Sequence, residues 1–408
     1  MGEKLSKYFD GVAAKRLTEV EINPDLSNQH EFNGINELKD ILGTERSFYH
    51  GDFIFIPDEE EKLIKSSGSL TWYDAREKHP KRSEYRLYYP TNEAFNAAKA
   101  EDLLIILKTK KQELLIIACP KGSTTERQLL YLFGLNEVQN KFLISDFREK
   151  DIDITFTERW ILESLGIELV KTQTDYLPLI LETFNGSFPS TDTFSSFARS
   201  TIKDASPIDD PDGALIKFME REELLFKALE KYLVEFKLKK GFGKDGLDVD
   251  DFLKFSLSVQ NRRKSRAGYS FENHLTFIFQ SNKVKFSRTP ITELNKRPDF
   301  IFPGIQEYTN LLFPENNLTM LGVKTTLKDR WRQILNEAAR IKHKHLITLE
   351  PAISENQTQE IFSENIQLIV PKLLLKSFNA TQQKDIITLK DFLNLVYLKE
   401  KKISHHPS

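Results

Sequence analysis

The sequence predicts a multidomain α+β protein, in which a mostly-β N-terminal domain precedes a C-terminal α/β domain with a central mixed sheet. The length of 408 residues fits two or three domains at about 100–200 residues each. Short β-branched and aromatic segments dominate the first half, whereas longer segments with helical spacing follow residue 213. Residues 183–213 are rich in Ser, Thr, Asp, Pro and Gly and are predicted to link domains 1–182 and 214–408.

The composition excludes several classes of protein. Positive and negative side chains nearly balance, at 58 Lys and Arg against 60 Asp and Glu, so attraction to nucleic acid must come from local basic patches. The single cysteine, Cys119, excludes a disulfide framework and a Cys-based zinc site, and it fits a reducing cytoplasm. Apolar runs stay far below the ~18 residues of a membrane span, so we expect no membrane partner.

The N-terminal half contains short segments that are typical of strands, separated by turn-prone or charged residues. Such a set favours an open or partly closed barrel. Helices are expected near Glu126–Phe133 and Thr157–Leu165. The predicted strands are residues 51–58, 69–75, 83–90, 102–109 and 113–120.

The C-terminal half begins with helical spacing over Leu215–Leu238, which ends before Gly241. Two further helices are expected at 249–260 and, after Gly268, at 270–279. A strand, a helix and a strand then follow one another, which is a βαβ unit and predicts a mixed sheet flanked by helices. The expected strands are 299–302, 318–326, 345–349 and 366–370, and the expected helix is 329–342.

Three side chains in this half suit metal-assisted hydrolysis of a phosphodiester. Asp299 opens one predicted strand, Lys324 lies near the end of the next, and Glu337 falls on the helix that follows. Carboxylates are hard oxygen ligands for Mg²⁺, and a lysine beside them can orient or help deprotonate a water molecule. Taken singly, each residue is equally typical of a turn, a solvated strand end or a helix surface.

Longer motifs around these residues resemble the EcoRII-like restriction endonucleases of the PD-(D/E)-x-K superfamily. The motifs are NRRKSRAGYSFENHL at 261–275, RPDFIFP at 297–303 and GVKTTLKDRWRQILNEA at 322–338, and the resemblance runs from about residue 215 to the C-terminus. In this family the second acidic ligand has moved from the strand onto the following helix. This shift explains why Gly322, two positions before Lys324, is not acidic.

The resemblance implies a role for five residues and a restriction-endonuclease-like fold. Asp299 and Glu337 would bind the metal and Lys324 would activate water. Glu272 would add a supporting acidic group, and Tyr308 corresponds to a family tyrosine near the site.

The segment Lys328-Asp329-Arg330 offers donor, acceptor and donor groups, which suits adjacent G·C pairs in a major groove. The alternative is a helix start with an Asp and two solvated cations. The resemblance implies that this segment reads the outer C·G pairs of a CCWGG-like site, with the central A·T pair flipped out of the stack.

A second basic cluster lies at 261–266. A solvated patch is the common interpretation of such a run, and a DNA phosphate contact is the one we favour here. Binding through it should weaken steeply with salt. The cluster consists of Arg262, Arg263, Lys264 and Arg266.

In the N-terminal domain, strand alternation places Arg82, Glu84 and Arg86 on one face. An exposed face with ion pairs and a surface that docks DNA are equally compatible with this pattern. The resemblance implies an effector-binding pseudobarrel that binds a second copy of the DNA site through these residues. His30 lies near another family contact, although a hydrogen-bonded loop histidine would look the same.

Together these features predict a cytoplasmic, homodimeric, effector-activated type II restriction endonuclease. It would use Mg²⁺ to cut both strands of double-stranded DNA and leave 5′-phosphates, with the N-terminal domain occluding the catalytic cleft until a second site binds. Two alternatives remain open. One is a modification-dependent nuclease whose N-terminal domain reads methylated cytosine, and the other is an inactive, sequence-specific DNA-binding protein.

Overall fold

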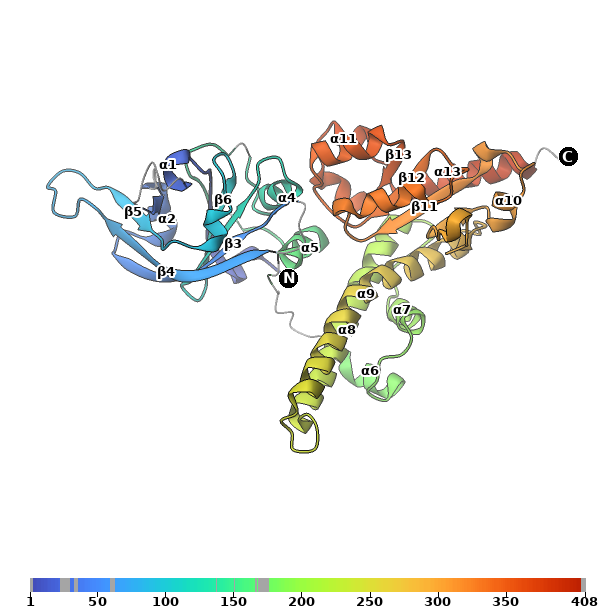
Figure 1. The fold of residues 1–408 in the computed structure, drawn as a ribbon, viewed down its shortest axis with the longest axis horizontal. Helices are drawn as coiled ribbons and strands as arrows, with labels where there is room; N and C mark the ends of the chain where they lie inside the picture. The colour runs from blue at the N-terminus through green and yellow to red at the C-terminus, as the bar shows by residue number, and fades with distance from the viewer. Residues whose placement is uncertain are drawn as a thin grey trace. The chain divides into compact units, whose positions relative to one another are not determined.

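The computed structural model describes residues 3–22, 30–32, 36–58, 63–136, 138–149, 151–165, 167 and 176–404, apart from the side chains of Lys264, Asp329, Ile403 and Ser404. The chain forms two compact units, 1–168 with 351–357 and 169–350 with 358–408 (Figure 1). Within the described ranges, no helix is both long and apolar enough to cross a membrane.

The first unit is built on one curled sheet of eight strands in the order β2-β5-β4-β3-β7-β6-β1-β8. Only β3 and β7 pair in parallel, and the other neighbours are antiparallel. The predicted mostly-β region is confirmed. Its sheet is open, because β2 and β8 lie at the two ends of the strand order and do not pair with each other. The bounds are β1 Phe9–Arg16, β2 Glu31–Phe32, β3 Ser47–Phe55, β4 Ile64–Asp74, β5 Tyr85–Tyr88, β6 Leu103–Thr109, β7 Leu114–Cys119 and β8 Leu143–Asp146.

Aromatic side chains fill the core of this unit. Phe32 stacks on Tyr89 with ring centroids 4.5 Å apart, and Phe53 meets Phe95 edge to face at 5.6 Å. Such pairs add to the area that they remove from water. Short helices lie beside the sheet: η1 Leu5–Lys7, α1 Glu19–Ile22, η2 Asn36–Leu38, α2 Lys39–Leu42, α3 Glu93–Asn96, α4 Thr124–Leu132 and α5 Phe156–Ser164.

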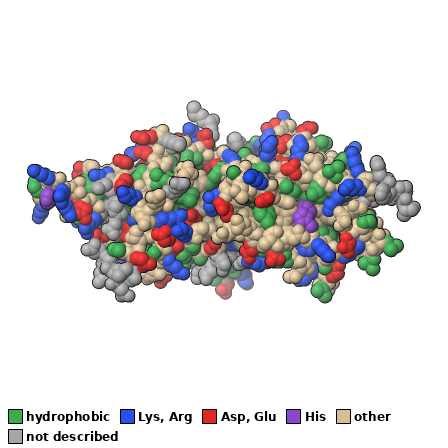
Figure 2. Space-filling view, turned by 90° about the horizontal axis from the view of Figure 1, so that it is seen from above, with side chains coloured by type: hydrophobic (Ala, Val, Ile, Leu, Met, Phe, Trp, Pro, Cys, Tyr) green, Lys and Arg blue, Asp and Glu red, His purple; other side chains and the backbone are tan. Residues whose placement is uncertain are grey.

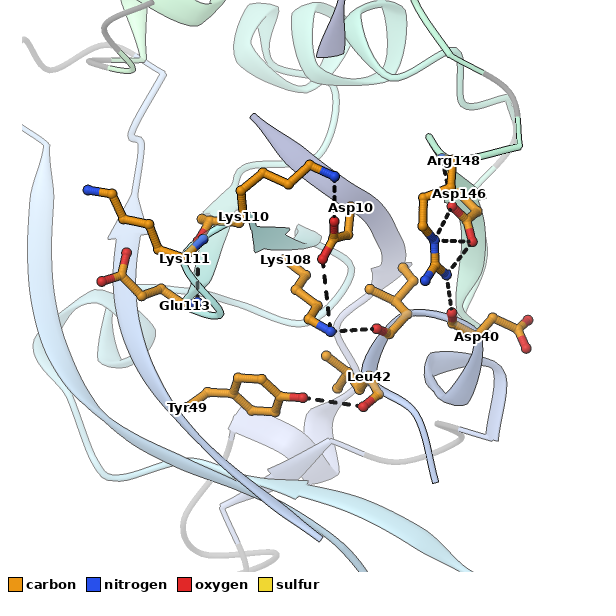
Figure 3. A network of polar contacts seen from close by, with 12 residues as sticks. Asp10, Asp40, Leu42, Tyr49, Lys108, Lys110, Lys111, Glu113, Asp146 and Arg148 are labelled. Carbon is orange, nitrogen blue, oxygen red and sulfur yellow. Dashed lines mark hydrogen bonds and ion pairs between the residues drawn. The ribbon is translucent and has the colours of Figure 1, made fainter. Parts of the chain in front are cut away.

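Charged side chains on and beside β1, β6 and β8 form ion pairs with one another, and two of them also donate hydrogen bonds to α2 (Figure 3). The Asp10 carboxylate lies 2.6 Å from the Lys110 ammonium and 4.0 Å from that of Lys108, which donates to a main-chain carbonyl of α2 at 3.1 Å. Arg148 pairs with Asp146 and donates to another α2 carbonyl at 2.7 Å. Exposed pairs of this kind contribute about 0–1 kcal/mol each, so they orient this edge more than they stabilise it.

The second unit starts with four helices: α6 Leu177–Phe184, α7 Thr191–Ser200, α8 Pro211–Lys240 and α9 Val249–Ser281. The predicted linker, 183–213, therefore contains α7 and belongs to this unit, and the boundary falls near residue 168 instead of 182. Phe194 of α7 is buried, and Phe184 and Phe188 pack in the same cluster against α8. The polar composition concealed these aromatic residues, and burying them orders the segment.

The helix α9 runs without a break through Gly268, where two helices were expected. A glycine inside a helix costs about 1 kcal/mol relative to alanine but does not prevent helical backbone. Contacts of α9 with α7 and α8 outweigh that loss. The predicted end of α8 is confirmed: Gly241 follows it with φ of +78°, a left-handed conformation that suits glycine.

The sheet of the second unit has five strands in the order β13-β12-β11-β10-β9. β11, β12 and β13 are parallel, whereas β9, β10 and β11 are antiparallel, so the predicted mixed sheet is confirmed. The strands are β9 Ser287–Arg288, β10 Phe300–Phe302, β11 Thr319–Lys324, β12 Lys344–Thr348 and β13 Ile366–Ile369. The other elements are η3 Glu293–Asn295, α10 Ile305–Thr309, η4 Glu315–Asn317, η5 Lys328–Asn336, α11 Glu355–Ser363, η6 Lys372–Ser377, α12 Gln382–Asp385 and α13 Leu389–Ser404.

The segment between β11 and β12 corrects one prediction. An α-helix was expected over 329–342, but the segment forms the 3-10 helix η5, which ends at Asn336. Glu337 follows with extended backbone, and Ala338 is left-handed with φ of +48°. Trp331, Ile334 and Ala338 are buried, because these turns satisfy the same apolar spacing as a longer helix would.

The packing of α6 and α7 on α8 predicts where the second unit can be truncated. A fragment that starts at residue 176 keeps both helices, whereas one that starts at Phe197 loses Phe184, Phe188 and Phe194 from their cluster. We expect the shorter fragment to melt at least several degrees lower, because losing 1 kcal/mol lowers the Tm of a unit of this size by about 2–4 °C. Equal melting temperatures by circular dichroism would contradict this packing.

Candidate active site

Two of the predicted residues meet where β10 and β11 pair. Phe300 of β10 lies opposite Leu321 of β11, so Asp299 and Lys324 lie at the same end of the two strands. The Asp299 Oδ2 atom accepts a hydrogen bond from the Val323 main-chain N–H at 2.6 Å and lies 3.7 Å from the Lys324 Nζ atom. The two side chains are 17% and 19% exposed, so solvent screens their attraction only in part.

Close packing of η5 on β11 brings Glu337 to the same place. Gly322 has no side chain, and a Cβ there would lie only 2.7 Å from the Ile334 Cγ2 atom. Glycine therefore allows η5 to lie directly on the strand. Glu337 begins one residue after η5 ends, so this contact sets the position of its carboxylate.

The Glu337 carboxylate is held in an unusual state. Burial, with a smaller contribution from the neighbouring Asp299 carboxylate, raises its pKa to about 7 against the opposing charge of Lys324. Its Oε2 atom is buried, and no hydrogen-bond donor reaches it from the residues that the structure describes. A buried carboxylate oxygen with no donor is costly unless a proton or a cation satisfies it.

Glu272 reaches this cluster from α9. Burial raises its pKa, as does the Asp299 carboxylate, while Arg288 and Lys324 lower it. The Arg288 Nη2 atom of β9 donates to the Glu272 Oε2 atom at 3.1 Å. Sequence reasoning missed Arg288, because its strand has only two residues and lies outside every motif.

These donors fit a hard divalent cation. Burial raises the pKa of Asp299 as well, against the opposing charge of Lys324, so both metal-ligand candidates would gain from a nearby positive charge. Mg²⁺ is commonly bound through one or two carboxylates and several waters. The described residues contain no group of three or more His, Cys, Asp or Glu side chains placed to hold a metal.

Tyr308 is buried and has its own partners. Its hydroxyl donates to the Glu293 carboxylate at 2.6 Å, and its main-chain carbonyl accepts from Arg340. Burial raises the pKa of Tyr308, and the hydrogen bond to Glu293 adds to the effect. Its catalytic role stays a prediction, and its contacts are those of a residue that orders the loop after β10.

Comparisons with known proteins show what the chain is similar to. Residues 226–393 match the family model described as EcoRII C terminal. The resemblance to EcoRII-like restriction enzymes is thus confirmed for the second unit. The chain is 38% identical over 229 residues to the type II restriction enzyme EcoRII of Escherichia coli, over 56% of this chain and 55% of the relative. It is 26% identical over 148 residues to the type II restriction enzyme SsoII of Shigella sonnei, over 34% of this chain and 47% of that protein.

The chain therefore spans about half the length of the curated relatives that it matches. Two solved structures are also similar. Metal-depleted Ecl18kI in complex with uncleaved, modified DNA has a TM-score of 0.45 and 19% identity, and covers 58% of this chain and 87% of its own. A complex of the restriction endonuclease PspGI with substrate DNA has a TM-score of 0.42 and 15% identity, and the match covers 57% of this chain and 98% of that one.

The predicted base-reading segment lies at the start of η5. Lys328 and Arg330 are exposed, and Lys328 has a left-handed backbone with φ of +32°. The Asp329 side chain lies outside the described part of the structure. The two cations are accessible to a ligand, and base recognition by the three residues stays a prediction.

The basic cluster of α9 is less accessible than predicted. Arg266 is only 7% exposed, stacks on the Phe226 ring at 4.2 Å and forms an ion pair with Glu223. The Arg263 side chain lies 2.6 Å from the Glu230 carboxylate. These arginines join α9 to α8, so a role for them in phosphate contact would require their ion pairs to open.

The fourth cation of that cluster, Lys264, has a side chain outside the described part of the structure. Arg262 lies over the Phe188 ring at 4.6 Å. A cation above an aromatic face keeps its charge, and Arg262 is partly buried there. Of the described cations of this cluster, Arg263 is the exposed one, although it is paired with Glu230.

The predicted DNA-facing row of the first unit differs in part from the structure. β5 starts at Tyr85, so Arg82 and Glu84 lie in the β4–β5 loop and strand alternation does not apply to them. Glu84 pairs with Arg86 at 2.7 Å, and Arg86 also pairs with Glu31 at 2.7 Å. The interpretation as an ion-paired face therefore holds for Glu84 and Arg86.

Arg82 instead belongs to a basic hairpin tip, which we define as residues 75–83, all exposed. Figure 2 shows Lys and Arg side chains gathered on this tip, at the left end of the view. The His30 Nε2 atom lies 3.2 Å from the Thr91 hydroxyl, on the loop that follows β5. This contact agrees with the alternative interpretation of His30 as a hydrogen-bonded loop histidine.

The raised pKa of Glu337 predicts a pH-dependent effect of Glu337→Gln on stability. The folded state holds the proton up to a pKa of about 7, whereas the unfolded state releases it near 4.5, so wild-type stability falls as pH rises between these values. Gln cannot ionise. In EDTA we expect Glu337→Gln to match the wild type near pH 4 and to be about 1–3 kcal/mol more stable at pH 8.5.

Thermal unfolding at both pH values measures this difference. Glu364 is exposed on the same unit, and Glu364→Gln is the matched control with no expected pH-dependent gain. An equal effect of Glu337→Gln at pH 4 and pH 8.5 would show that the carboxyl is not held protonated in the fold.

Proposed function

We propose that the chain is a Mg²⁺-dependent type II restriction endonuclease that hydrolyses both strands of a CCWGG-like DNA site. The observation that carries this proposal is the meeting of Asp299, Lys324 and Glu337 in one shielded place, where Glu337 has a buried oxygen without a donor. The 38% identity to EcoRII over 229 residues supports the same activity.

Each residue would have a separate task in this reaction. Asp299 and Glu337 would hold Mg²⁺, which when bound polarises the phosphate and stabilises the charge that develops on it. Lys324, 3.7 Å from Asp299 Oδ2, would orient the attacking water. The water oxygen would bond to phosphorus as the bond to the 3′-oxygen breaks, the water would lose a proton to solvent, and the leaving 3′-oxygen would take one up, which gives a 3′-hydroxyl and a 5′-phosphate.

The target and the assembly form part of the same proposal. Lys328, Asp329 and Arg330 would read the outer C·G pairs, and the central A·T pair would be flipped out. A two-fold symmetric homodimer would place one active site on each strand of a palindromic target. Arg262 and the other cations of 262–266 would contribute phosphate contacts.

We further propose that the first unit binds a second copy of the DNA site and delays cleavage until it does. The exposed basic hairpin tip supports this role, because its cations face solvent in a chain of nearly balanced charge.

Adding a short duplex with a CCWGG site should then accelerate cleavage of a one-site plasmid. Arg82→Ala should remove this acceleration, and an unaffected response would assign the effect elsewhere.

Plasmid cleavage tests the catalytic proposal. With Mg²⁺ the wild type should cut both strands, and with EDTA it should not cut. Lys324→Ala and Asp299→Asn should lower the cleavage rate by about 100- to 10,000-fold, the usual contribution of a positioned acid–base group. Lys217 lies in an exposed ion pair with Asp204 on α8, and Lys217→Met is the control that should keep full activity.

The products separate the alternatives. Sequencing the cut ends gives the target and the stagger, and ends outside CCWGG sites would refute the target. Cleavage only of methylated plasmid would identify a modification-dependent nuclease. Tight binding to one sequence with no cleavage in Mg²⁺ would identify an inactive DNA-binding protein.

A further inference from the structure

Arg288 lies at the centre of the candidate site although no sequence motif includes it. It belongs to the edge strand β9 and pairs with Phe300 of β10. The next residue, Thr289, donates its main-chain N–H to the Asp299 carbonyl at 2.9 Å. The backbone of Arg288 is therefore fixed directly beside Asp299.

The Arg288 guanidinium is only partly used by the protein. It donates to the Glu272 Oε2 atom through Nη2 at 3.1 Å and through Nε at 3.3 Å. No hydrogen bond to its Nη1 atom occurs among the residues that the structure describes, and 29% of the side chain is exposed. Part of the Arg288 side chain is thus accessible from solvent.

The charges of the site leave room for one more anion. Burial raises the pKa of both Asp299 and Glu272, and the Arg288 charge opposes that shift in each. A divalent cation held by Asp299 and Glu337 would attract a phosphodiester, and the Arg288 guanidinium, on the strand next to Asp299, supplies a further positive group for it.

We propose that Arg288 binds a phosphate of the DNA at the cleavage site, and that its guanidinium exchanges the Glu272 carboxylate for phosphate oxygens when DNA arrives. This inference rests on the proposed nuclease function. A guanidinium suits the exchange, because its planar donors match carboxylate and phosphate oxygens equally well. Glu272 would hold Arg288 in place before substrate binds.

Arg288→Met tests the exchange through two independent measurements. In calorimetric titrations of the free protein with Mg²⁺, removing a nearby positive charge should tighten metal binding about three- to tenfold. In plasmid cleavage, the rate at saturating DNA should fall at least about 100-fold, because the transition-state charge loses a partner. Arg288→Lys should recover part of the rate, and Lys217→Met should change neither quantity.

Other results overturn the inference. If Arg288→Met weakens Mg²⁺ binding, Arg288 serves only to hold Glu272 in place. If the Arg288→Met variant cleaves DNA at the wild-type rate, Arg288 has no role in cleavage. If Arg288→Met does not fold, Arg288→Lys decides alone: a wild-type cleavage rate with unchanged Mg²⁺ affinity would exclude a role for the guanidinium fork. A wild type that binds Mg²⁺ but never cuts DNA would instead refute the proposed nuclease function.

Discussion

The second unit depends on one electrostatic constraint, which is that carboxylates are held together where water screens them poorly. Burial raises the pKa of both Asp299 and Glu337, the Asp299 charge adds to the shift of Glu337, and Lys324 offsets only part of each. A fold built for stability alone would pair or expose these groups. Here they stay together, and among the described residues no donor reaches the buried Glu337 oxygen, which is the arrangement that the proposed cation site would need.

The backbone around the site shows how the constraint is maintained. The Asp299 carboxylate is fixed by a main-chain N–H of β11, not by a flexible side chain. Glu337 is fixed indirectly, because Gly322 lets Ile334 lie against the strand and η5 ends at Asn336, directly before Glu337. Both carboxylates are therefore positioned by the same strand, β11, which also ends in Lys324. Any movement of that strand would carry all three groups together, and the geometry is preserved as a unit.

Much of this arrangement could be predicted from the sequence, because it follows from local patterns. The apolar runs around Phe300, Leu321 and Leu346 predicted the strands, and strand ends predicted that Asp299 and Lys324 would meet. Apolar spacing also predicted the buried side of the segment after β11, but not its 3-10 geometry, since both helix types bury nearly the same residues. The interruption expected at Gly268 was wrong, because packing of α9 on two neighbouring helices outweighs the preference of one residue.

Contacts between distant segments could not be predicted in the same way. The pairing of Arg288 with Glu272 joins residues 16 positions apart on a strand and a helix, and neither position is distinctive alone. Likewise, nothing in the basic run of 262–266 indicated that Arg266 would pair with Glu223 beneath the helix surface, because both partners look solvated in sequence. Short motifs therefore identify which residues can carry out the chemistry. The ion pairs place Arg288 beside Glu272, and they hold Arg266 against Glu223 of α8.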